Sequence, residues 1–370
     1  MKNNSVRTNT FSWVSLPLLF FGAGVIAYRM KQGLGASTHL SDTFPWGLWI
    51  SVDVLCGVAL AAGAFTVAAA VYIFNLKPYR PILRPAILTG FLGYLLVIVA
   101  LFIDIGRPFR IWHPLILWNP NSVMFEVAWC VILYSTVLAM EFAPIVLERF
   151  GLKRLLRILD AVTIPLVIAG VILSTLHQSS LGSLYLIVPS KLHPLWYSRM
   201  VPLFFFVSAL AGGLCVLIIE GTVSQRVFHH HVDIHVLRGL ARAAVVVLIL
   251  YGAMKISDLM FRGGLSRLAM DREGIFFGME IMIGIVLPLL LYALPGIRET
   301  RQGLFAFACL GVTGLILNRI NVSLIGMAGS SGTSYFPSWM EFAITATLIL
   351  AGVALFRWAA RSLPVFEKQA

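Results

Sequence analysis

The sequence predicts an all-α integral membrane protein with about ten transmembrane helices, and three observations lead to this prediction. Of the 370 residues, 59% are hydrophobic and only 12% are charged, and the mean hydropathy is +0.89. Soluble globular chains are about 45–50% apolar and about 25% charged. Apolar stretches near the length of about 20 residues that crosses a bilayer also recur along the whole chain.

Each apolar stretch is bounded by charges or by Pro and Gly, and we predict one span for each. In chain order the predicted spans are 13–28, 47–74, 85–103, 123–146, 161–176, 201–223, 239–261, 275–294, 304–324 and 340–358. No small-residue cleavage site follows the first stretch, so it is interpreted as a retained span and not as a signal peptide. We expect one membrane domain, residues 1–370, with four-helix bundles at 13–146 and 161–294 and an extra helix pair at 304–358.

The distribution of Lys and Arg predicts the orientation. With ten spans both termini share a side, and that side carries seventeen basic residues, the opposite loops nine, while Lys255 and Arg319 fall inside spans. Short cytoplasmic loops are enriched in Lys and Arg, so both termini are predicted to be cytoplasmic. The net charge of +12 is spread over all the inner loops. It therefore indicates membrane topology and not a nucleic-acid partner.

The cysteines do not predict a metal site. Cys56, Cys130, Cys215 and Cys309 each stand alone within a predicted span, without a CxxC pair. An iron–sulfur or zinc site is therefore not expected, and the four thiols are interpreted as small packing residues.

The histidines argue against a haem. Two facing imidazoles within spans would be needed, but only His177 lies in or at the edge of a span. The run His229 to His231, with Asp233 and His235, lies in an inner loop, where a solvated segment or an adventitious metal site explains it better than a functional site. We expect no haem in this chain, so redox chemistry requires an organic cofactor or the centres of a partner.

Several polar side chains are predicted to lie inside the membrane near the outer face. A charge at the bilayer centre costs about 2.5–3.5 kcal/mol and usually has a function or a partner. Asp53 lies seven residues past Trp46, which is roughly 10 Å into the second span. Glu126 lies about 7 Å into the fourth span, and His177 and Gln178 close the fifth. Asp104 ends the third span close to the same layer.

A second set of ionisable residues lies in the later spans. Its members are Lys255, Asp258, Glu280, Arg319 and Glu341, all in the outer half, while Glu141 and Glu220 are in the inner half. Ion pairs such as Asp258 with Arg319 or Lys255 with Glu280 would neutralise this set. Asp53, Glu126 and His177 have no evident cationic partner, which favours a functional site.

A lipid quinone fits the outer layer. Its head group takes up two electrons and two protons, and an imidazole with shifted carboxylates can hydrogen-bond its oxygens and exchange protons. A transporter site would lie near the midplane on broken helices, and these groups are shallower. On this interpretation the stretch LHQSSLGSLY, from Leu176, ends a span with polar groups that form the floor of a quinone pocket. The alternative is a polar helix end capped by its own serines.

Eight ordered motifs then carry a resemblance that covers nearly the whole chain. They are FPWGLWISVDVLCGVALAAG at Phe44, YRPILRPAIL at Tyr79, IDIGRP at Ile103, NPNSVMFE at Asn119, MEFAP at Met140, LHQSSLGSLY at Leu176, HPLW at His193 and YFPSWMEF at Tyr335. Together they resemble the NrfD/PsrC family of quinone-interacting membrane subunits. Within that family the sequence is most similar to the HybB-type membrane subunit of hydrogenase-2-type [NiFe] hydrogenases.

The resemblance implies a haem-free subunit of a bacterial inner membrane that exchanges electrons between menaquinone or ubiquinone and a periplasmic ferredoxin-like iron–sulfur subunit. A hydrogenase complex further implies large and small [NiFe] hydrogenase subunits as partners, with all nickel–iron and iron–sulfur centres outside this chain. Two alternatives stay open. One is the same scaffold in a polysulfide or other sulfur-compound oxidoreductase, and the other is a transporter or membrane anchor without redox contact.

The matching motifs also imply roles for single residues. His177 and Gln178 are assigned to hydrogen bonds with the quinone head group, and Asp53 and Glu126 to proton exchange. The remaining assignments are close approach of helices or ring at Gly57 and Gly182, ring packing or interfacial anchoring at Trp46, Trp49 and Trp118, and an extended proton path at Glu141 and Asp104.

Overall fold

The computed structural model describes residues 2–264, 268, 271–332 and 335–366, and for residues 2–14 only the backbone. Within this part of the chain all the regular elements are helical. They are α1 (Lys2–Gln32), η1 (Trp49–Cys56), α2 (Gly57–Leu60), α3 (Gly63–Ala68), η2 (Ala69–Ile73), η3 (Lys77–Tyr79), α4 (Arg80–Asp104), η4 (Pro108–Arg110), α5 (His113–Ile116), α6 (Val123–Phe150), α7 (Lys153–Ser183), α8 (Val201–Phe228), α9 (Ile234–Phe261), α10 (Arg272–Ile281), η6 (Met282–Val286), α11 (Leu287–Ala293), α12 (Pro295–Arg298), α13 (Arg301–Ile320), η7 (Asn321–Ile325), α14 (Gly326–Ser331) and α15 (Trp339–Ser362).

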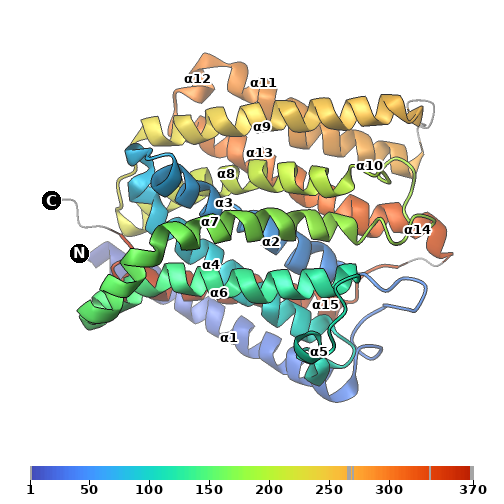
Figure 1. Cartoon of the computed structure of the whole chain (residues 1–370), viewed down its shortest axis with the longest axis horizontal. Helices are drawn as coiled ribbons and strands as arrows, with labels where there is room; N and C mark the ends of the chain where they lie inside the picture. The colour runs from blue at the N-terminus through green and yellow to red at the C-terminus, as the bar shows by residue number, and fades with distance from the viewer. Residues whose placement is uncertain (1, 265–267, 269–270, 333–334, 367–370) are drawn as a thin grey trace.

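The long helices run along one common direction, as Figure 1 shows. Nine of them, counted over the described residues, are long and apolar enough to cross a membrane, and they coincide with the second to tenth predicted spans. Helix α1 covers the first predicted span, 13–28. The protein is therefore an all-α, multi-pass membrane protein. Helix α1 begins and α15 ends at the same end of the bundle, here called the inner end (Figure 1).

Three predicted spans are not continuous α-helices. In the second, η1 is a π-helix and α2 and α3 are separated at Ala61 and Ala62. In the eighth and ninth, the π-helical segments η6 and η7 interrupt the α-helix. Such wide turns are frequent at functional sites. Apolar length alone predicts a span and not the hydrogen-bond register inside it, so the sequence did not reveal these interruptions.

Neighbouring helices pack mostly in chain order. Helix α6 lies along α7, α7 along α8, and α8 along α9. Helix α13 packs against α8 and η6, whereas α15 packs against α1 and α4. The division into two four-helix bundles and an extra pair stays a prediction.

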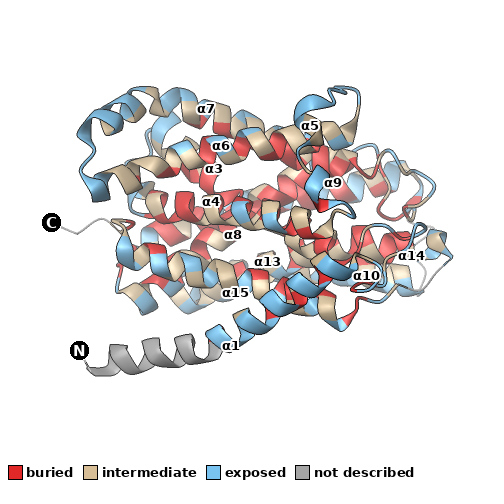
Figure 2. Ribbon diagram, turned by 90° about the horizontal axis from the view of Figure 1, so that it is seen from below, coloured by how far each residue is buried: buried red, intermediate tan, exposed pale blue. Residues whose placement is uncertain are grey.

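Buried residues gather along the middle of the bundle, as Figure 2 shows in red. The broken second span is the most deeply buried of the candidate spans, with 72% of its apolar window buried, while α7 has only 11% buried. Helix α7 is therefore a peripheral helix with few inward-facing residues.

Candidate functional site

Helix α7 has an apolar face that points away from the bundle and a polar face that points into it. Ile164, Ile168, Ile172 and Leu176 are between 45% and 56% exposed. The opposite face buries Gly170, Ser174, His177, Gln178 and Ser180. Residues spaced by three or four share one face of a helix. The arrangement is the reverse of a soluble surface helix, because the helix turns its polar atoms into the bundle and its apolar side chains outward.

His177 is completely buried, and its Nδ1 lies 2.8 Å from the hydroxyl oxygen of Tyr94 on α4. Its Nε2 has no hydrogen-bond partner among the described residues. Buried polar atoms are nearly always paired, so this atom is an exception that calls for an explanation. The ring is therefore held from one side and open for a hydrogen bond on the other.

The LHQSSLGSLY stretch contains the end of the fifth span, as predicted, but that end comes later than the predicted Leu176 to Gln178. Helix α7 continues to Ser183, so His177 lies inside the helix and not at its end. The serines are compatible with helix because their hydroxyls donate to carbonyls one turn earlier, for example Ser179 to Thr175 at 3.0 Å. Such local bonds satisfy a hydroxyl without breaking the helix.

Gln178 joins α7 to the broken second span. Its Nε2 donates to the carbonyl of Val58 in α2 at 2.9 Å. That carbonyl is available because the chain break makes the Ala62 amide bond to Ala59 instead. The Gln178 Oε1 atom has no partner in the described chain. The Gln178 Oε1 is thus a second buried polar atom without a partner in the described chain, on the residue next to His177.

Glu126 lies in the first turn of α6, whose start is capped by the Ser122 hydroxyl. One of its carboxylate oxygens accepts a hydrogen bond from the buried Ser180 hydroxyl of α7. Ser180 is one helical turn beyond His177. Glu126 itself is exposed at the surface of the bundle. Its carboxylate therefore contacts the surroundings of the bundle and, through Ser180, the polar face of α7.

Asp53 faces a different neighbour. Its Oδ2 accepts a hydrogen bond of 2.6 Å from Thr345 on α15. No hydrogen bond joins it to α7 in the part of the chain that the structure describes. Asp104, at the end of α4, has one carboxylate oxygen without a partner, and the adjacent Ile105 carbonyl accepts from Arg29 at 2.8 Å. The structure therefore places Glu126 at the contact between α6 and α7, His177 at the contact between α7 and α4, and Asp53 at the contact with α15.

The predicted aromatic residues have separate surroundings. Trp49 is buried and its Nε1 donates to the Glu341 carbonyl at 3.2 Å. Trp46 packs edge-on to Tyr185 with ring centres 5.4 Å apart. Trp118 is 63% exposed, which is typical of an interfacial anchor.

The two predicted glycines lie at close helix contacts. A Cβ at Gly182 would come within 2.6 Å of the Pro202 Cα, and one at Gly57 within 3.0 Å of a Val97 methyl. Gly182 thus allows the end of α7 to approach the start of α8.

A family model described as "Polysulphide reductase, NrfD" matches residues 36–328. The chain is a member of the NrfD family. It is similar to a protein of Nitratidesulfovibrio vulgaris, with 42% identity over 94% of this chain and 92% of the relative.

Two further relatives of this NrfD protein have informative names. The "Probable Ni/Fe-hydrogenase 2 b-type cytochrome subunit" of Escherichia coli is 33% identical over 95% of this chain and 93% of its own length. The "Menaquinone reductase, integral membrane subunit" of Nitratidesulfovibrio vulgaris is 29% identical over 97% of this chain and 92% of its own length.

A second buried polar cluster of this NrfD chain surrounds Glu280 on α10. Lys255 of α9 forms an ion pair with it, as predicted. The same carboxylate accepts from Trp196 Nε1 at 2.9 Å, Asn318 Nδ2 at 2.8 Å and Asn321 Nδ2 at 3.0 Å. Four donors compensate a buried carboxylate well. These bonds hold α9, α10 and the start of η7 together.

The other suggested pair, Asp258 with Arg319, is not present. Asp258 binds Arg262 one turn later on α9, at 2.7 Å. Arg319 is fully buried and donates to the Phe205 carbonyl at 3.1 Å and the Ser208 hydroxyl at 3.0 Å. Its guanidinium also lies 3.8 Å from the centre of the Phe205 ring, a favourable cation–π distance. Arg319 therefore donates to neutral acceptors and not to the carboxylate that the sequence suggested as its partner.

Glu341 is fully buried and closes the outer start of α15. It accepts from the Ser338 amide at 2.9 Å, in a capping box, and from the Tyr335 hydroxyl. Burial and the adjacent Glu341 carboxylate raise the pKa of Tyr335 above its ordinary value, so the phenol remains protonated and donates. This carboxylate therefore has a structural explanation.

The sequence did not identify Tyr94, Ser174 and Tyr134, which line the polar face of α7. Tyr94 stands alone in an apolar stretch, and Tyr134 and Ser174 stand beside other hydroxyl residues. Such residues are common in membrane helices without special function. Their positions are revealed only by the fold, which buries Ser174 on the inward face of α7, bonds Tyr94 to His177 and brings the Tyr134 ring near Gly170. Within the described chain, no group of three or more His, Cys, Asp and Glu residues is arranged to bind a metal.

Proposed function

We propose that this NrfD protein is the quinone-interacting membrane subunit of a hydrogenase complex. In this proposal it passes electrons from a periplasmic iron–sulfur partner to menaquinone. The observation that supports it is the completely buried His177, fixed through Nδ1 and open at Nε2, on a peripheral membrane helix. The names of the hydrogenase 2 and menaquinone reductase relatives agree with this choice.

The residues of the polar face suit a quinone head group. A quinone carbonyl needs hydrogen-bond donors, and a quinol hydroxyl needs acceptors. The open His177 Nε2 can serve in either role, and the open Gln178 Oε1 can accept. A bound quinone would supply the two-electron, two-proton redox chemistry, which none of these side chains provides.

His177 is proposed to hold and move the proton. If Tyr94 donates to Nδ1, the neutral imidazole carries its proton on Nε2. Release from Nε2 and uptake at Nδ1 can then occur on one ring, and the original tautomer has to be restored before Nε2 can release the second proton. Gln178 fixes the helix to α2 and orients its own carbonyl oxygen. Glu126, bonded to Ser180 one turn away, is proposed to exchange protons with the outer side.

Asp53 and Asp104 remain proposed proton groups, but the contact with Thr345 places Asp53 at the contact between the second span and α15. Ring packing by Trp46 is also a proposal, whereas Trp49 already donates to Glu341. We propose that the chain itself holds no haem. His177 is held by Tyr94, and the other histidines lie in loops or at helix ends in the described structure.

The proposed location is a bacterial inner membrane with both termini in the cytoplasm. The proposed partners are a ferredoxin-like iron–sulfur subunit and the large and small [NiFe] hydrogenase subunits, which would supply the metal centres. A sulfur-compound oxidoreductase is the second candidate, because the family description names polysulphide reductase. The metal content of the purified complex distinguishes them, since only the hydrogenase contains nickel.

The first experiment replaces His177 by Ala in the tagged complex. We expect quinone reduction to fall by about 100-fold or more, the scale of a lost general acid. Electron transfer from the partner to a soluble dye should remain near the wild-type rate. His235→Ala, an exposed histidine at the start of α9, is the matched control and should change neither rate.

Unchanged quinone reduction in the His177 variant would remove His177 from the mechanism. A wild-type complex without quinone reductase activity, nickel or iron would contradict the whole proposal and favour a transporter or an anchor.

A further inference from the structure

A groove on the surface of the bundle lies between α6 and α15, with α4 as its floor. It has a volume of 910 Å³. Helix α4 packs against both α6 and α15, and α15 approaches α4 closely at Gly352, where a Cβ would lie 2.6 Å from a Leu96 methyl. The groove extends from the neighbourhood of this contact to the inner end of the bundle. It therefore faces the surroundings of the bundle in the inner half of the membrane.

The deep part of the groove is apolar. Leu88 of the floor is fully buried, and the Phe91 ring of α4 stacks on Phe142 of α6 with ring centres 5.0 Å apart. Above this floor Leu95 and Leu355 are 38% and 42% exposed. A hydrocarbon chain that lay along α4 would therefore contact apolar side chains of three helices.

The inner end of the groove is positively charged. Arg149 lies in the last turn of α6 and Arg361 in the last turn of α15. Both are exposed, and both line the groove. Neither guanidinium forms an ion pair or a hydrogen bond within the described chain. A cation suits the last turn of a helix, but this placement leaves the N–H donors of both groups available.

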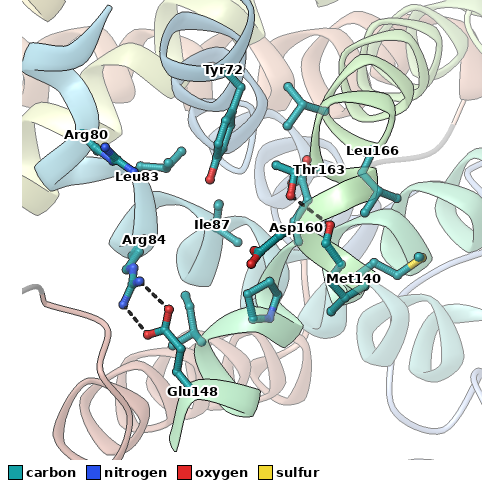
Figure 3. Close-up of a pocket in the computed structure, with 15 residues that line it drawn as sticks. Tyr72, Arg80, Leu83, Arg84, Ile87, Met140, Glu148, Asp160, Thr163 and Leu166 are labelled. Atoms are coloured by element: carbon teal, nitrogen blue, oxygen red, sulfur yellow. Dashed lines mark hydrogen bonds and ion pairs between the residues drawn. The ribbon is translucent and has the colours of Figure 1, made fainter. Parts of the chain in front are cut away.

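No carboxylate is among the described residues that line the groove. Glu148, the chain neighbour of Arg149, instead lines a separate cavity of 240 Å³ between α4, α6 and α7. There the Arg84 guanidinium donates to both Glu148 oxygens, at 2.9 and 2.7 Å, as the dashed lines in Figure 3 show. Because this carboxylate is already paired, the two arginines of the groove are left to attract an anion.

We propose that the groove binds one anionic phospholipid, with its two acyl chains along α4 and its phosphate at Arg149 and Arg361. The polarity of the groove follows that of the lipid, because Leu95, Phe142 and Leu355 lie at the deep end and the arginines at the inner end. Basic pockets between membrane helices on the cytoplasmic side bind anionic head groups, and the inner end is the proposed cytoplasmic end. Guanidinium groups bind phosphate through paired N–H donors.

The volume and the charge of the groove favour this occupant over two others. The groove falls in the range of about 300–1,000 Å³ that is usual for ligand sites. The tail of a quinone would fill the apolar part but leave both guanidinium groups unpaired, because its head group is neutral. In a symmetric dimer the same patch lies on both subunits, so four guanidinium groups would meet without a carboxylate of the groove.

The lipid site goes beyond the proposed redox function and does not rest on it. His177 and Gln178 lie near the outer end of α7, whereas the groove lies at the inner end and does not involve α7. A bound lipid would contact α6 and α15 at once. It would thereby add to the contacts that α4 makes with these two helices.

The test measures lipid binding to the purified, delipidated complex in a nonionic detergent by native mass spectrometry. Dioleoyl-phosphatidylglycerol is the anionic probe, and dioleoyl-phosphatidylcholine has the same chains without a net charge. We expect the first phosphatidylglycerol to bind the wild type about tenfold more tightly than the first phosphatidylcholine, and Arg149→Gln with Arg361→Gln to weaken its binding by about 25-fold, about fivefold for each basic residue near an anionic lipid.

Arg154→Gln with Arg157→Gln is the matched control. It removes the same charge from the same end of the bundle, but from exposed residues at the start of α7, and should bind phosphatidylglycerol as the wild type does. Leu95→Trp keeps every charge and fills the deep end of the groove. We expect it to weaken the binding by about tenfold, the effect of about two methylene groups kept out of an apolar site.

Equal losses in the two double arginine variants would overturn the inference, because net charge and not the groove would then attract the lipid. Equal binding of the two lipids to the wild type, or displacement of phosphatidylglycerol by menaquinone, would also overturn it. A dimer that the groove variants dissociate would assign the groove to a second copy of the chain. The measurement detects bound lipid and not redox activity, so absence of quinone reduction would overturn the proposed function alone.

Discussion

The Nδ1 atom of His177 lies 2.8 Å from the Tyr94 hydroxyl oxygen, across the contact between α7 and α4. Both side chains are buried, so the bond is protected from competing water. It holds the imidazole in one orientation and leaves Nε2 as the only ring nitrogen that can meet a ligand.

Tyr94→Phe tests this bond directly. The change leaves a buried Nδ1 unpaired, and we expect a loss of about 1–3 kcal/mol in the free energy of unfolding. Quinone reduction should fall by about tenfold, because the ring loses its orientation and its proton donor. The rate is measured with a quinol-forming assay and the stability by thermal unfolding in detergent.

Tyr292→Phe is the control for the loss of a phenol. Tyr292 packs on Phe307 with ring centres 5.6 Å apart and forms no hydrogen bond within the described chain. Equal effects of the two substitutions would show that the Tyr94 hydroxyl has no special role.

Gly182→Ala should weaken the contact between α7 and α8. The new methyl would lie 2.6 Å from the Pro202 Cα and 2.8 Å from the Val201 carbonyl oxygen, and backbone atoms cannot yield as a flexible side chain can. Overpacking of this kind costs about 1–3 kcal/mol. Gly24→Ala in α1 is the control, because no atom lies within 4 Å of the added Cβ. Both are compared by their unfolding temperature, and an unchanged Gly182 variant would contradict the close packing.

Much of the fold was predictable, because membrane spans are set by apolar length and by the spacing of charges. Depth in the predicted spans placed Glu126 at the level of the polar end of α7, where its carboxylate accepts from Ser180. Depth could not reveal rotation about the helix axis, so it grouped Asp53 with Glu126 and His177 although Asp53 turns toward Thr345. It also could not show that α7 continues past His177, because serines that bond their own helix look like a helix end in sequence.

The interrupted helices were unpredictable for a related reason. The residues of η6 are all apolar or Gly, and the few polar residues of η1 and η7 do not mark a wider turn in the sequence. In η7 the Asn321 amide reaches Glu280 and the Phe276 carbonyl, and Ser323 bonds Ser51 of η1 at 2.6 Å. These long-range bonds are invisible in a single sequence.

Thr345→Val is expected to affect Asp53. The substitution keeps the shape of the side chain but removes the donor that binds the Asp53 Oδ2. A partly buried carboxyl then loses its only hydrogen bond among the described residues, at a cost of about 1–3 kcal/mol. Thr347→Val is the matched control, since that hydroxyl bonds the carbonyl of Ala343 in its own helix. Equal unfolding temperatures for the two variants would show that the Asp53 contact contributes nothing.

The ion pair of Lys255 and Glu280 gives the last prediction. Both side chains are at most 7% exposed, so Lys255→Met leaves a buried carboxylate without its counter-charge. Removing one partner of a buried pair costs about 3–5 kcal/mol. Glu280 keeps its bonds from Trp196, Asn318 and Asn321, which places the expected loss at the lower end of that range.

Adding Glu280→Gln to Lys255→Met should recover more than half of that loss. The amide is neutral, so the double variant no longer buries a charge. Its oxygen can still accept from Trp196 and Asn321 at the Oε2 position, while its NH2 group takes the place of the Oε1 that accepts from Lys255 and Asn318. The free energy of unfolding of the four proteins in the cycle gives the coupling between the two residues. A double variant that is no more stable than Lys255→Met alone would mean that packing, and not charge, makes Lys255 important to the contact between α9 and α10.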